Sequence, residues 1–362
     1  MTLTNSAEFG VIAQRDFFDH DIAKASSLNG YYVVHNEDFV YNPRISVSAP
    51  VGPVNRNKLG KTGVMSPLYT VFRPHDINAA YLEYFFKSGY WHKFMNFNGD
   101  SGARADRFSI KDQVFFEMPI PFPYSIEQRK IGNYLKRLDT LLSLHQRKLE
   151  KLKILKKAML EKMFPKNGAK VPEIRFSGFT EDWEQRKLGE IFEESNERSS
   201  ELDILSVSVS NGIYPASESD RDVNPGASLE NYKIVHKGDI VYNSMRMWQG
   251  AVGESVYEGI VSPAYVVVRA KQEVDSRYFG YLLKRPKMLY KYLCYSQGNS
   301  KDTQTLRYER FAEIEAKISV EVTEQQIISK CIGRIDSLLS LHQRKLEKLR
   351  QIKKSMLERM FV

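Results

Sequence analysis

One stretch of about 28 residues occurs twice and decides the fold. Residues 137–164 read RLDTLLSLHQRKLEKLKILKKAMLEKMF, and residues 334–361 read RIDSLLSLHQRKLEKLRQIKKSMLERMF. The copies match at 21 of 28 positions with a constant offset of 197 residues. This period is too long for a solenoid, so it indicates a duplicated unit made of one domain and one helix.

Each copy is predicted to form one long helix. Good helix formers dominate both copies, and neither contains Pro or Gly. Apolar residues alternate at spacings of four and three, which is typical of a coiled-coil seam, and Pro165 ends the first helix. A whole domain separates the helices, so we predict an antiparallel pair within the chain. The predicted seam comprises Leu138, Leu142, His145, Leu149, Leu152, Ile335, Leu339, His342, Leu346 and Leu349. A histidine in such a seam more often sets the register than binds a ligand.

The segments between the helices repeat more faintly. Residues 38–42 (DFVYN) match residues 239–243 (DIVYN), and residues 63–69 match residues 259–265. Short apolar runs bounded by turn residues indicate strands, and two longer amphipathic runs indicate helices. Strands are expected at 39–41, 68–72, 115–119, 240–242, 264–268 and 315–319, and helices at 78–88 and 275–285. The predicted class is α+β, with mostly antiparallel or mixed sheets.

The repeat predicts four consecutive segments. They are a first domain at 1–126, a helix at 127–165, a second domain at 166–323 and a helix at 324–362. The second domain opens with a segment, 172–192, whose copy would precede residue 1. We therefore expect the first domain to be incomplete at its N-terminal end.

The net charge of +9 lies entirely in the two helical segments. Residues 129–164 carry 11 basic and 3 acidic side chains, and residues 329–362 carry 9 and 3. Residues 1–128 carry 12 and 13, and residues 165–328 carry 21 and 25, so both domains are slightly acidic. A basic balance suggests an acidic partner such as nucleic acid, although a solvated helix face explains most of these lysines.

The composition excludes several classes of protein. With 42% hydrophobic and 27% charged residues, the chain can bury a core and is not wholly disordered. No apolar run approaches the length of a membrane span, and the first 30 residues lack the pattern of a signal peptide. Only Cys294 and Cys331 are present, which excludes a disulfide framework and a cysteine-based zinc site. We expect a cytoplasmic protein.

Signals of catalysis are weak. The run from Gly60 to Thr62 resembles the end of a phosphate-binding loop, but Asn55 stands where that loop needs Gly. The seven histidines show no metal-ligand spacing, so no metal site is predicted. Asp302, Glu315 and Lys317 could form the acidic centre of a single-chain, metal-dependent nuclease, which stays open as an alternative. A coiled-coil adaptor without DNA contact is a second alternative.

A family resemblance follows from the order of the motifs. PEIRF at 172–176, GFT at 178–180, KLG at 187–189, GDIVYN at 238–243 and VSPAY at 261–265 occur in turn, before the second helix. In this order the chain resembles the specificity subunits of bacterial type I restriction-modification systems, over nearly its whole length. The resemblance implies two target-recognition domains joined by two helices that form an antiparallel coiled coil.

The resemblance also implies a function and partners. Such subunits are not enzymes; they read a bipartite double-stranded DNA site and bind two modification (N6-adenine methyltransferase) subunits as well as restriction (translocase and nuclease) subunits. No cofactor is expected in this chain, whereas S-adenosylmethionine, ATP and Mg would be bound by the partners. Base reading needs a few basic and amide side chains on loops. The candidates are Arg44, Lys58, Lys61, Arg104 and Arg107 in the first domain, and Arg246, Gln249, Gln297, Asn299 and Lys301 in the second.

Overall fold

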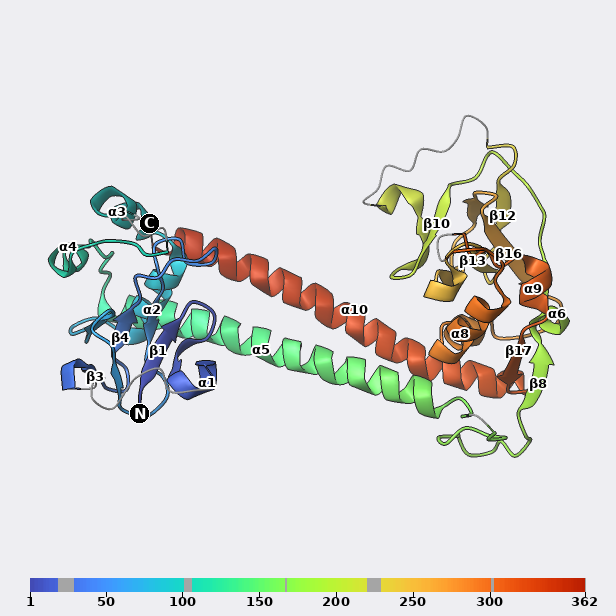
Figure 1. Ribbon diagram of the computed structural model, residues 1–362, viewed down its shortest axis with the longest axis horizontal. Coiled ribbons are helices and arrows are strands. Elements are labelled where there is room, and N and C mark those ends of the chain that lie inside the picture. Colours follow the sequence, from blue (N-terminus) through green and yellow to red (C-terminus); the bar gives the residue numbers. More distant parts are fainter. Residues whose placement is uncertain (19–28, 101–105, 167, 220–228, 301–302, 362) are drawn as a thin grey trace. The chain divides into compact units, whose positions relative to one another are not determined.

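A computed structural model describes residues 1–18, 29–100, 106–166, 168–219, 229–300 and 303–361. The chain divides into two compact units (Figure 1). Unit 1 combines Met1–Lys148 with His342–Val362, and unit 2 is Leu149–Leu341. Each unit therefore contains one of the predicted domains and a part of each predicted helix.

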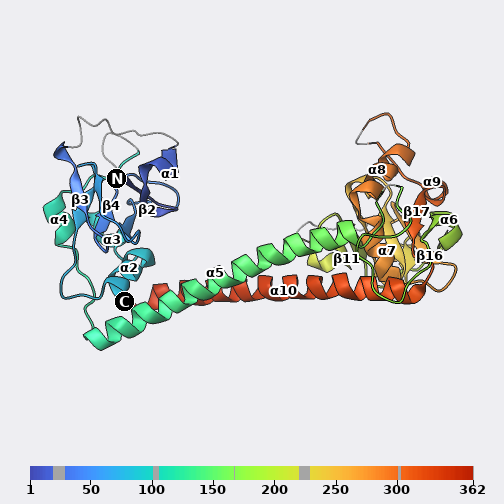
Figure 2. The ribbon, with the colours of Figure 1, turned by 90° about the horizontal axis from the view of Figure 1, so that it is seen from below.

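Two long helices are shared between the units. Helix α5 is Ser125–Lys162 and helix α10 is Val322–Arg359, each of 38 residues. Both begin two residues before the predicted start, and α5 ends ahead of Pro165. Within each unit the segments of α5 and α10 lie side by side (Figure 2). They run antiparallel, because Asp139 pairs with Lys353 in unit 1 and Lys156 pairs with Asp336 in unit 2.

Unit 2 is built on antiparallel strand pairs. Its strands are β8 (Glu184–Lys187), β9 (Phe192–Glu194), β10 (Leu205–Ser208), β11 (Gly212–Pro215), β12 (Lys233–Val235), β13 (Ile240–Asn243), β14 (Val252–Glu254), β15 (Gly259–Val261), β16 (Tyr265–Ala270) and β17 (Glu315–Ile318). Four of them form a sheet in the order β14-β13-β16-β9, and the others pair as β10-β11, β12-β15 and β17-β8. The helices are α6 (Leu188–Ile191), α7 (Ser276–Leu283), α8 (Pro286–Tyr295) and α9 (Tyr308–Ala312), with 3-10 turns η2 (Ala216–Glu218) and η3 (Met247–Gln249).

The core of unit 2 joins its α+β domain to the end of helix α5. Phe164, just beyond the end of α5, is fully buried, and its ring centroid lies 5.4 Å from that of Tyr278 on α7. Trp183 packs edge-on against the same phenylalanine at 6.0 Å. Buried aromatic side chains contribute large apolar areas to a core. The end of the helix is therefore part of the domain rather than a spacer beside it.

Unit 1 repeats this plan with fewer strands. They are β1 (Leu3–Ser6), β2 (Gly10–Ala13), β3 (Tyr32–Val34), β4 (Phe39–Tyr41), β5 (Val54–Arg56), β6 (Gly63–Met65) and β7 (Thr70–Phe72). The sheet order β5-β4-β7 corresponds to β14-β13-β16 in unit 2. The helices are α1 (Gln14–Phe18), α2 (Ala79–Ser88), α3 (His92–Asn98) and α4 (Asp112–Phe116). The ring centroids of Phe361 and Tyr81 lie 5.2 Å apart, and this contact corresponds to that of Phe164 with Tyr278 in unit 2.

The α+β class is confirmed, and the ladders between named strands are all antiparallel in the described part of the chain. Most of the predicted strands and both short helices are observed, with ends that differ by up to two residues. The strand predicted at 115–119 is wrong, because residues 112–116 form helix α4 and residues 117–124, which lead to α5, contain no strand. Its counterpart β17 pairs with β8. Among the described residues of unit 1 no strand corresponds to β8, so residues 118–121 have no ladder to join.

Candidate nucleic-acid interface

In unit 2, two loops far apart in sequence meet at one end of the domain. The backbone N–H of Leu306 donates to the carbonyl of Ser244 at 2.8 Å, which ties the loop after α8 to the loop after β13. Asn243 starts the first loop, since its side-chain oxygen accepts from the Met245 N–H at 3.0 Å, a typical asparagine turn. Buried Met247 anchors the loop beneath its exposed residues.

This arrangement brings the unit 2 candidates together. Arg246 and Gln249 are exposed on the first loop, and Gln297 and Asn299 are exposed on the second. Lys301 lies outside the described residues. Arginine and the amide residues can each form two hydrogen bonds to one base edge. The unit 2 loops therefore present the side chains that base reading requires.

Unit 1 joins the equivalent loops in the same way. The Phe108 N–H donates to the carbonyl of Pro43 at 2.7 Å. This contact sets Arg44 opposite Arg107 in an isolated antiparallel bridge. Both arginines line a cavity of about 540 Å³. Two guanidinium groups on one cavity repel each other unless an anion lies between them. Arg104 lies outside the described residues.

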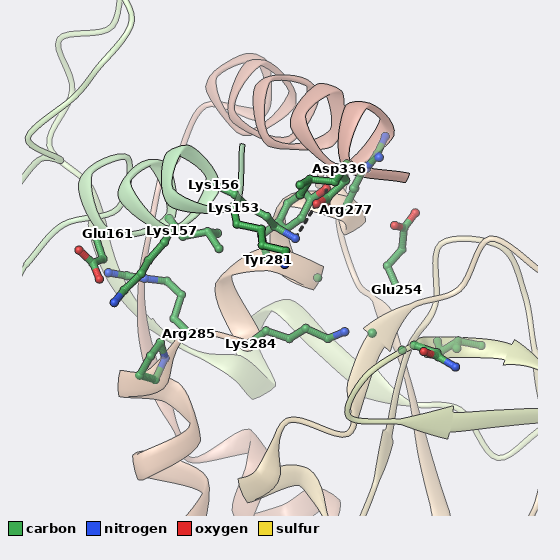
Figure 3. A pocket seen from close by; sticks show the side chains of 18 of the residues that line it. Lys153, Lys156, Lys157, Glu161, Glu254, Arg277, Tyr281, Lys284, Arg285 and Asp336 are labelled. Atoms are coloured by element: carbon green, nitrogen blue, oxygen red, sulfur yellow. Dashed lines mark hydrogen bonds and ion pairs between the residues drawn. The ribbon is translucent and has the colours of Figure 1, made fainter. Parts of the chain in front are cut away.

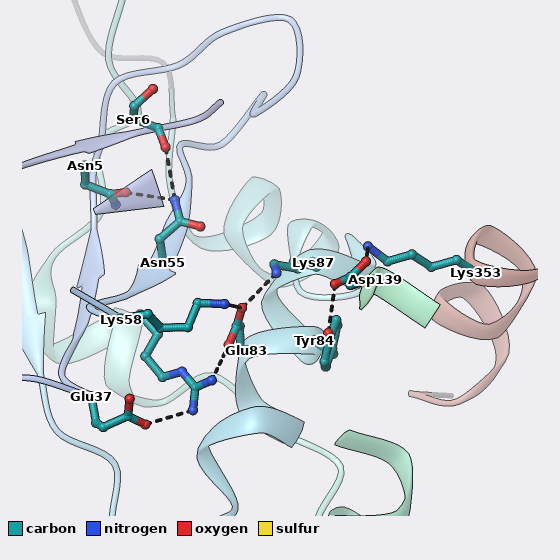
Figure 4. A network of polar contacts seen from close by, with 11 residues as sticks. Asn5, Ser6, Glu37, Asn55, Lys58, Glu83, Tyr84, Lys87, Asp139 and Lys353 are labelled. Atoms are coloured by element: carbon teal, nitrogen blue, oxygen red, sulfur yellow. Dashed lines mark hydrogen bonds and ion pairs between the residues drawn. The ribbon is translucent and has the colours of Figure 1, made fainter. Parts of the chain in front are cut away.

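An amide network that sequence reasoning missed supports the unit 1 loop. The Asn42 amide donates to the carbonyl of Asn5 at 2.7 Å. The Asn55 amide donates to the Asn5 side chain at 2.8 Å (Figure 4). Asn42 also accepts from the Arg44 N–H at 3.0 Å, as Asn243 does from Met245. The YN dipeptide, which occurs in both repeats at residues 41–42 and 242–243, could have indicated this asparagine turn from the sequence.

Lys58 and Lys61 are placed apart from these loops, between β5 and β6. The Lys58 ammonium lies 2.6 Å from the carboxylate of Glu83, which is 4% exposed and also pairs with Arg56 and Lys87 (Figure 4). Burial raises the pKa of Glu83, but Lys87 and Lys58 outweigh it and hold the pKa at about 2. Lys58 therefore has a structural role as a counter-ion. Lys61 is exposed, and DNA contact by either lysine stays a prediction.

The ten residues of the predicted helix seam are shielded from solvent to different degrees. Leu138, Leu149, Leu152, Ile335 and Leu346 are buried, and Leu142, Leu339 and Leu349 are half-buried. In unit 1 the Nδ1 atoms of His145 and His342 lie 2.8 Å apart. Burial lowers the pKa of His342, which favours the neutral ring that such a hydrogen bond requires. The histidines thus contact each other at the predicted register position.

Four leucines lie outside this seam and remain accessible. Leu141 and Leu144 on α5 are 43% and 51% exposed, and Leu338 and Leu341 on α10 are 41% and 39% exposed. They are repeat counterparts, each 197 residues apart. The run LLSL could have revealed them, because adjacent leucines cannot both face one seam.

The chain matches a known family over both repeats. A family model described as type I restriction modification DNA specificity domain matches residues 15–154 and again residues 180–351. The chain belongs to this family. Specificity subunits of this family are non-catalytic and provide DNA sequence specificity.

Two solved specificity subunits match this chain over most of its length. The S subunit of a type I restriction-modification system from M. genitalium matches with a TM-score of 0.57 at 14% identity, over 92% of this chain and 85% of that one. The HsdS subunit from Thermoanaerobacter tengcongensis matches with a TM-score of 0.47 at 15% identity, over 91% and 81%. The M. genitalium likeness shows a shared fold.

Two residues of the alternative nuclease centre, Glu315 and Lys317, are hydrogen-bonded to other parts of the fold. The Lys317 ammonium donates to the carbonyl of Ala169 at 2.7 Å, and Glu315 bonds Gln185 across the β17-β8 ladder. Asp302 lies outside the described residues. In the described part of the specificity subunit, no three His, Cys, Asp or Glu side chains gather as metal ligands would.

None of the described helices is both long and apolar enough to cross a membrane.

Proposed function

We propose that this specificity subunit reads a bipartite double-stranded DNA site, one half with each recognition domain. The observation that carries the proposal is the paired loop in each unit, closed by Leu306–Ser244 and by Phe108–Pro43. Each paired loop presents at least one arginine, the side chain that most often reads guanine in the major groove. Two different sets of loop residues would then read two different half-sites.

The charge distribution supports the proposal that partner subunits supply most of the affinity for the DNA backbone, while this chain provides the sequence specificity. Neutralised phosphates supply most non-specific DNA affinity, and both recognition domains are slightly acidic. The modification subunits would provide the missing positive charge around the duplex, and would bind S-adenosylmethionine. Restriction subunits would bring ATP and Mg for translocation and cleavage.

The exposed leucines offer a surface for docking these partners. Leu141 with Leu144, and Leu338 with Leu341, form two equivalent apolar patches on the outer sides of α5 and α10. An apolar stripe on a helix is a common docking site for a partner helix. Two equivalent patches fit two copies of one modification subunit.

Methylation mapping of the reconstituted complex tests the reading function. The double variant Arg246→Ala/Gln249→Ala should relax or abolish recognition of one half-site, and Arg44→Ala/Arg107→Ala should affect the other half. Each lost bidentate base contact costs about 1–3 kcal/mol of discrimination. Lys237→Ala, an exposed cation outside the paired loops, is the control and should leave the site unchanged. If both double variants methylate the parental sequence, the adaptor alternative is preferred.

A further inference from the structure

Unit 2 contains a large cavity between helix α5, helix α7 and the β10-β11 hairpin. Its volume is about 1000 Å³, and its walls include Lys156, Tyr281, Lys284 and Gly212 (Figure 3). Seven cationic side chains and three carboxylates line it, a net charge of +4. The paired loops of the nucleic-acid interface contribute no residue to it.

The cavity contains a lysine, Lys284, that has no pairing partner among the described residues. Lys156 is paired with Asp336 at 2.6 Å, and Asp336 also accepts the Tyr281 hydroxyl at 2.8 Å. Lys284 extends into the cavity at the end of α7 and has no hydrogen bond or ion pair with the described residues. Burial lowers its pKa and Lys156 lowers it further, whereas the nearby Asp336 carboxylate acts in the opposite direction. Glu254 also faces the cavity, and burial raises its pKa.

The repeat provides an internal comparison. Unit 1 has the equivalent cavity, of about 430 Å³, lined by Lys87 and Lys353, which are the counterparts of Lys284 and Lys156. There Glu83 lies 2.8 Å from Lys87 and pairs with it, and the same carboxylate also pairs with Arg56 and Lys58. The counterpart of Glu83 in unit 2 is Gly280. Unit 2 therefore keeps the lysine and lacks the internal carboxylate that pairs with it in unit 1.

Glycines keep space open in front of Lys284. A Cβ on Gly212, at the hairpin, would lie 3.3 Å from the Lys284 ammonium, and one on Gly280 would lie 3.4 Å from Glu254. An ammonium with three free donors, held between small residues, suits an oxygen-rich anion. The apolar walls at Leu160 and Ile213 suit a less polar group beside that anion.

We propose that the unit 2 cavity binds a phosphate-bearing ligand, with the Lys284 ammonium donating to a phosphate oxygen. The phosphate could belong to a free nucleotide or to the DNA backbone, since the cavity recognises the same group in either. The site is separate from base reading, so it does not depend on which half-site each domain recognises.

Fluorescence anisotropy of a mant-labelled ADP on the full-length chain tests the proposal. Saturable binding that pyrophosphate displaces is expected, and Lys284→Gln should weaken it about tenfold, as the loss of a charged hydrogen bond does. Gly280→Glu should have a similar effect, because the new carboxylate would pair with Lys284 four residues on, as Glu83 does with Lys87. Lys87→Gln removes the same charge from unit 1 and should leave binding unchanged.

Competition with a 20-base-pair duplex identifies the source of the phosphate. Displacement of the labelled nucleotide by the duplex assigns the site to the DNA backbone, and failure of the duplex to displace it assigns the site to a free nucleotide. The proposal is overturned if the wild-type chain does not bind mant-ADP saturably. It is also overturned if folded Lys284→Gln or Gly280→Glu binds like wild type, or if Lys87→Gln weakens binding equally. Methylation mapping of Lys284→Gln should show the parental sequence, which separates this test from that of base reading.

Discussion

The Nδ1 atoms of His145 and His342 lie 2.8 Å apart, and the two residues are separated by 197 positions, the offset of the repeat. Each copy of the repeated helix therefore contacts the other through the same residue. In an antiparallel pair of helices, two equivalent residues face each other only where the register is symmetrical about them. The polar pair sets this register, because any shift would place a histidine against leucine.

The histidine pair should make stability depend on pH. The pKa of His342 is lowered in the folded chain from an ordinary value of 6.5, by burial first and then by Lys148, His145 and Lys345. A lowered pKa means that the folded state binds fewer protons than the unfolded state. Stability from this group is thus full above pH 6.5 and is lost as the pH falls through the folded pKa. Thermal melts between pH 8 and 5 should show a falling melting temperature.

A double asparagine variant is the control for this prediction. His145→Asn/His342→Asn keeps a polar pair in the seam but removes its titration. Its melting temperature should fall less between pH 8 and 5 than that of the wild-type chain. His75→Asn changes an exposed histidine and should behave like wild type. Equal pH dependence in all three proteins would contradict a role for the seam pair.

Glu324 should be important for the stability of unit 2. Its carboxylate is 1% exposed and accepts from Arg175 at 2.7 Å, Trp183 at 3.0 Å and Ser319 at 2.6 Å. Glu324→Gln leaves Arg175 without its counter-ion, which should cost about 3 kcal/mol. Urea unfolding measures the loss. The counterpart in unit 1, Glu127, is exposed, so Glu127→Gln should change the free energy of unfolding by less than about 0.5 kcal/mol. Similar losses in both variants would refute the assignment.

The helices should set the gap between the half-sites. Because Lys156 faces Asp336, Lys151 lies level with Leu341. Four residues inserted after both positions lengthen the pair by about 6 Å, or about two base pairs at ~3.4 Å each. They also rotate its end by about 40° beyond a full turn. Methylation mapping should find intact half-sites with a longer gap, whereas insertion after Lys151 alone should disrupt the seam. If the variant with both insertions is active and keeps the parental gap, the helices do not set the distance between the half-sites.

The repeat predicts that residues 166–362 form a symmetric dimer. This fragment lacks Met163 and Phe164, which belong to the core of unit 2. Met360 and Phe361 are their repeat counterparts, so α10 of a second copy can fill the gap in a two-fold arrangement. Folding should therefore depend on dimerisation. With modification subunits, the dimer should methylate a palindromic site whose halves match the one read by this domain in the parent.

Sedimentation and thermal melts of the fragments check this prediction. Phe361→Ala should weaken the 166–362 dimer, since the ring has no replacement. Fragment 1–165 should be less soluble and lower melting, because it has no counterpart of the β17-β8 pair among its described residues and presents an open sheet edge. A monomeric 166–362, or a 1–165 of equal stability, would show that the seam has been misinterpreted.

Sequence patterns predicted the elements that depend on local periodicity. The helices, their seam and strands such as β4 and β13 follow from the spacing of apolar residues, which is visible along a single stretch of chain. The strand expected at 115–119 is absent, because strand formation depends on contacts outside the local stretch of chain. A strand exists only with a partner, and the partner of its counterpart β17 is β8, in which Lys187 pairs with Glu315 from 128 positions earlier in the chain.

The sequence alone determined that this protein is a duplication of one domain and one helix, with the positive charge on the helices. Tertiary structure decided which side chains are free to act. The sequence does not distinguish the roles of Lys58 and Lys284. In the structure, Lys58 contacts buried Glu83, whereas Lys284 faces an open cavity. The physical reason is that a charge is neutralised by whatever lies within a few ångströms. Those neighbours come from residues tens to hundreds of positions away, which no local pattern records.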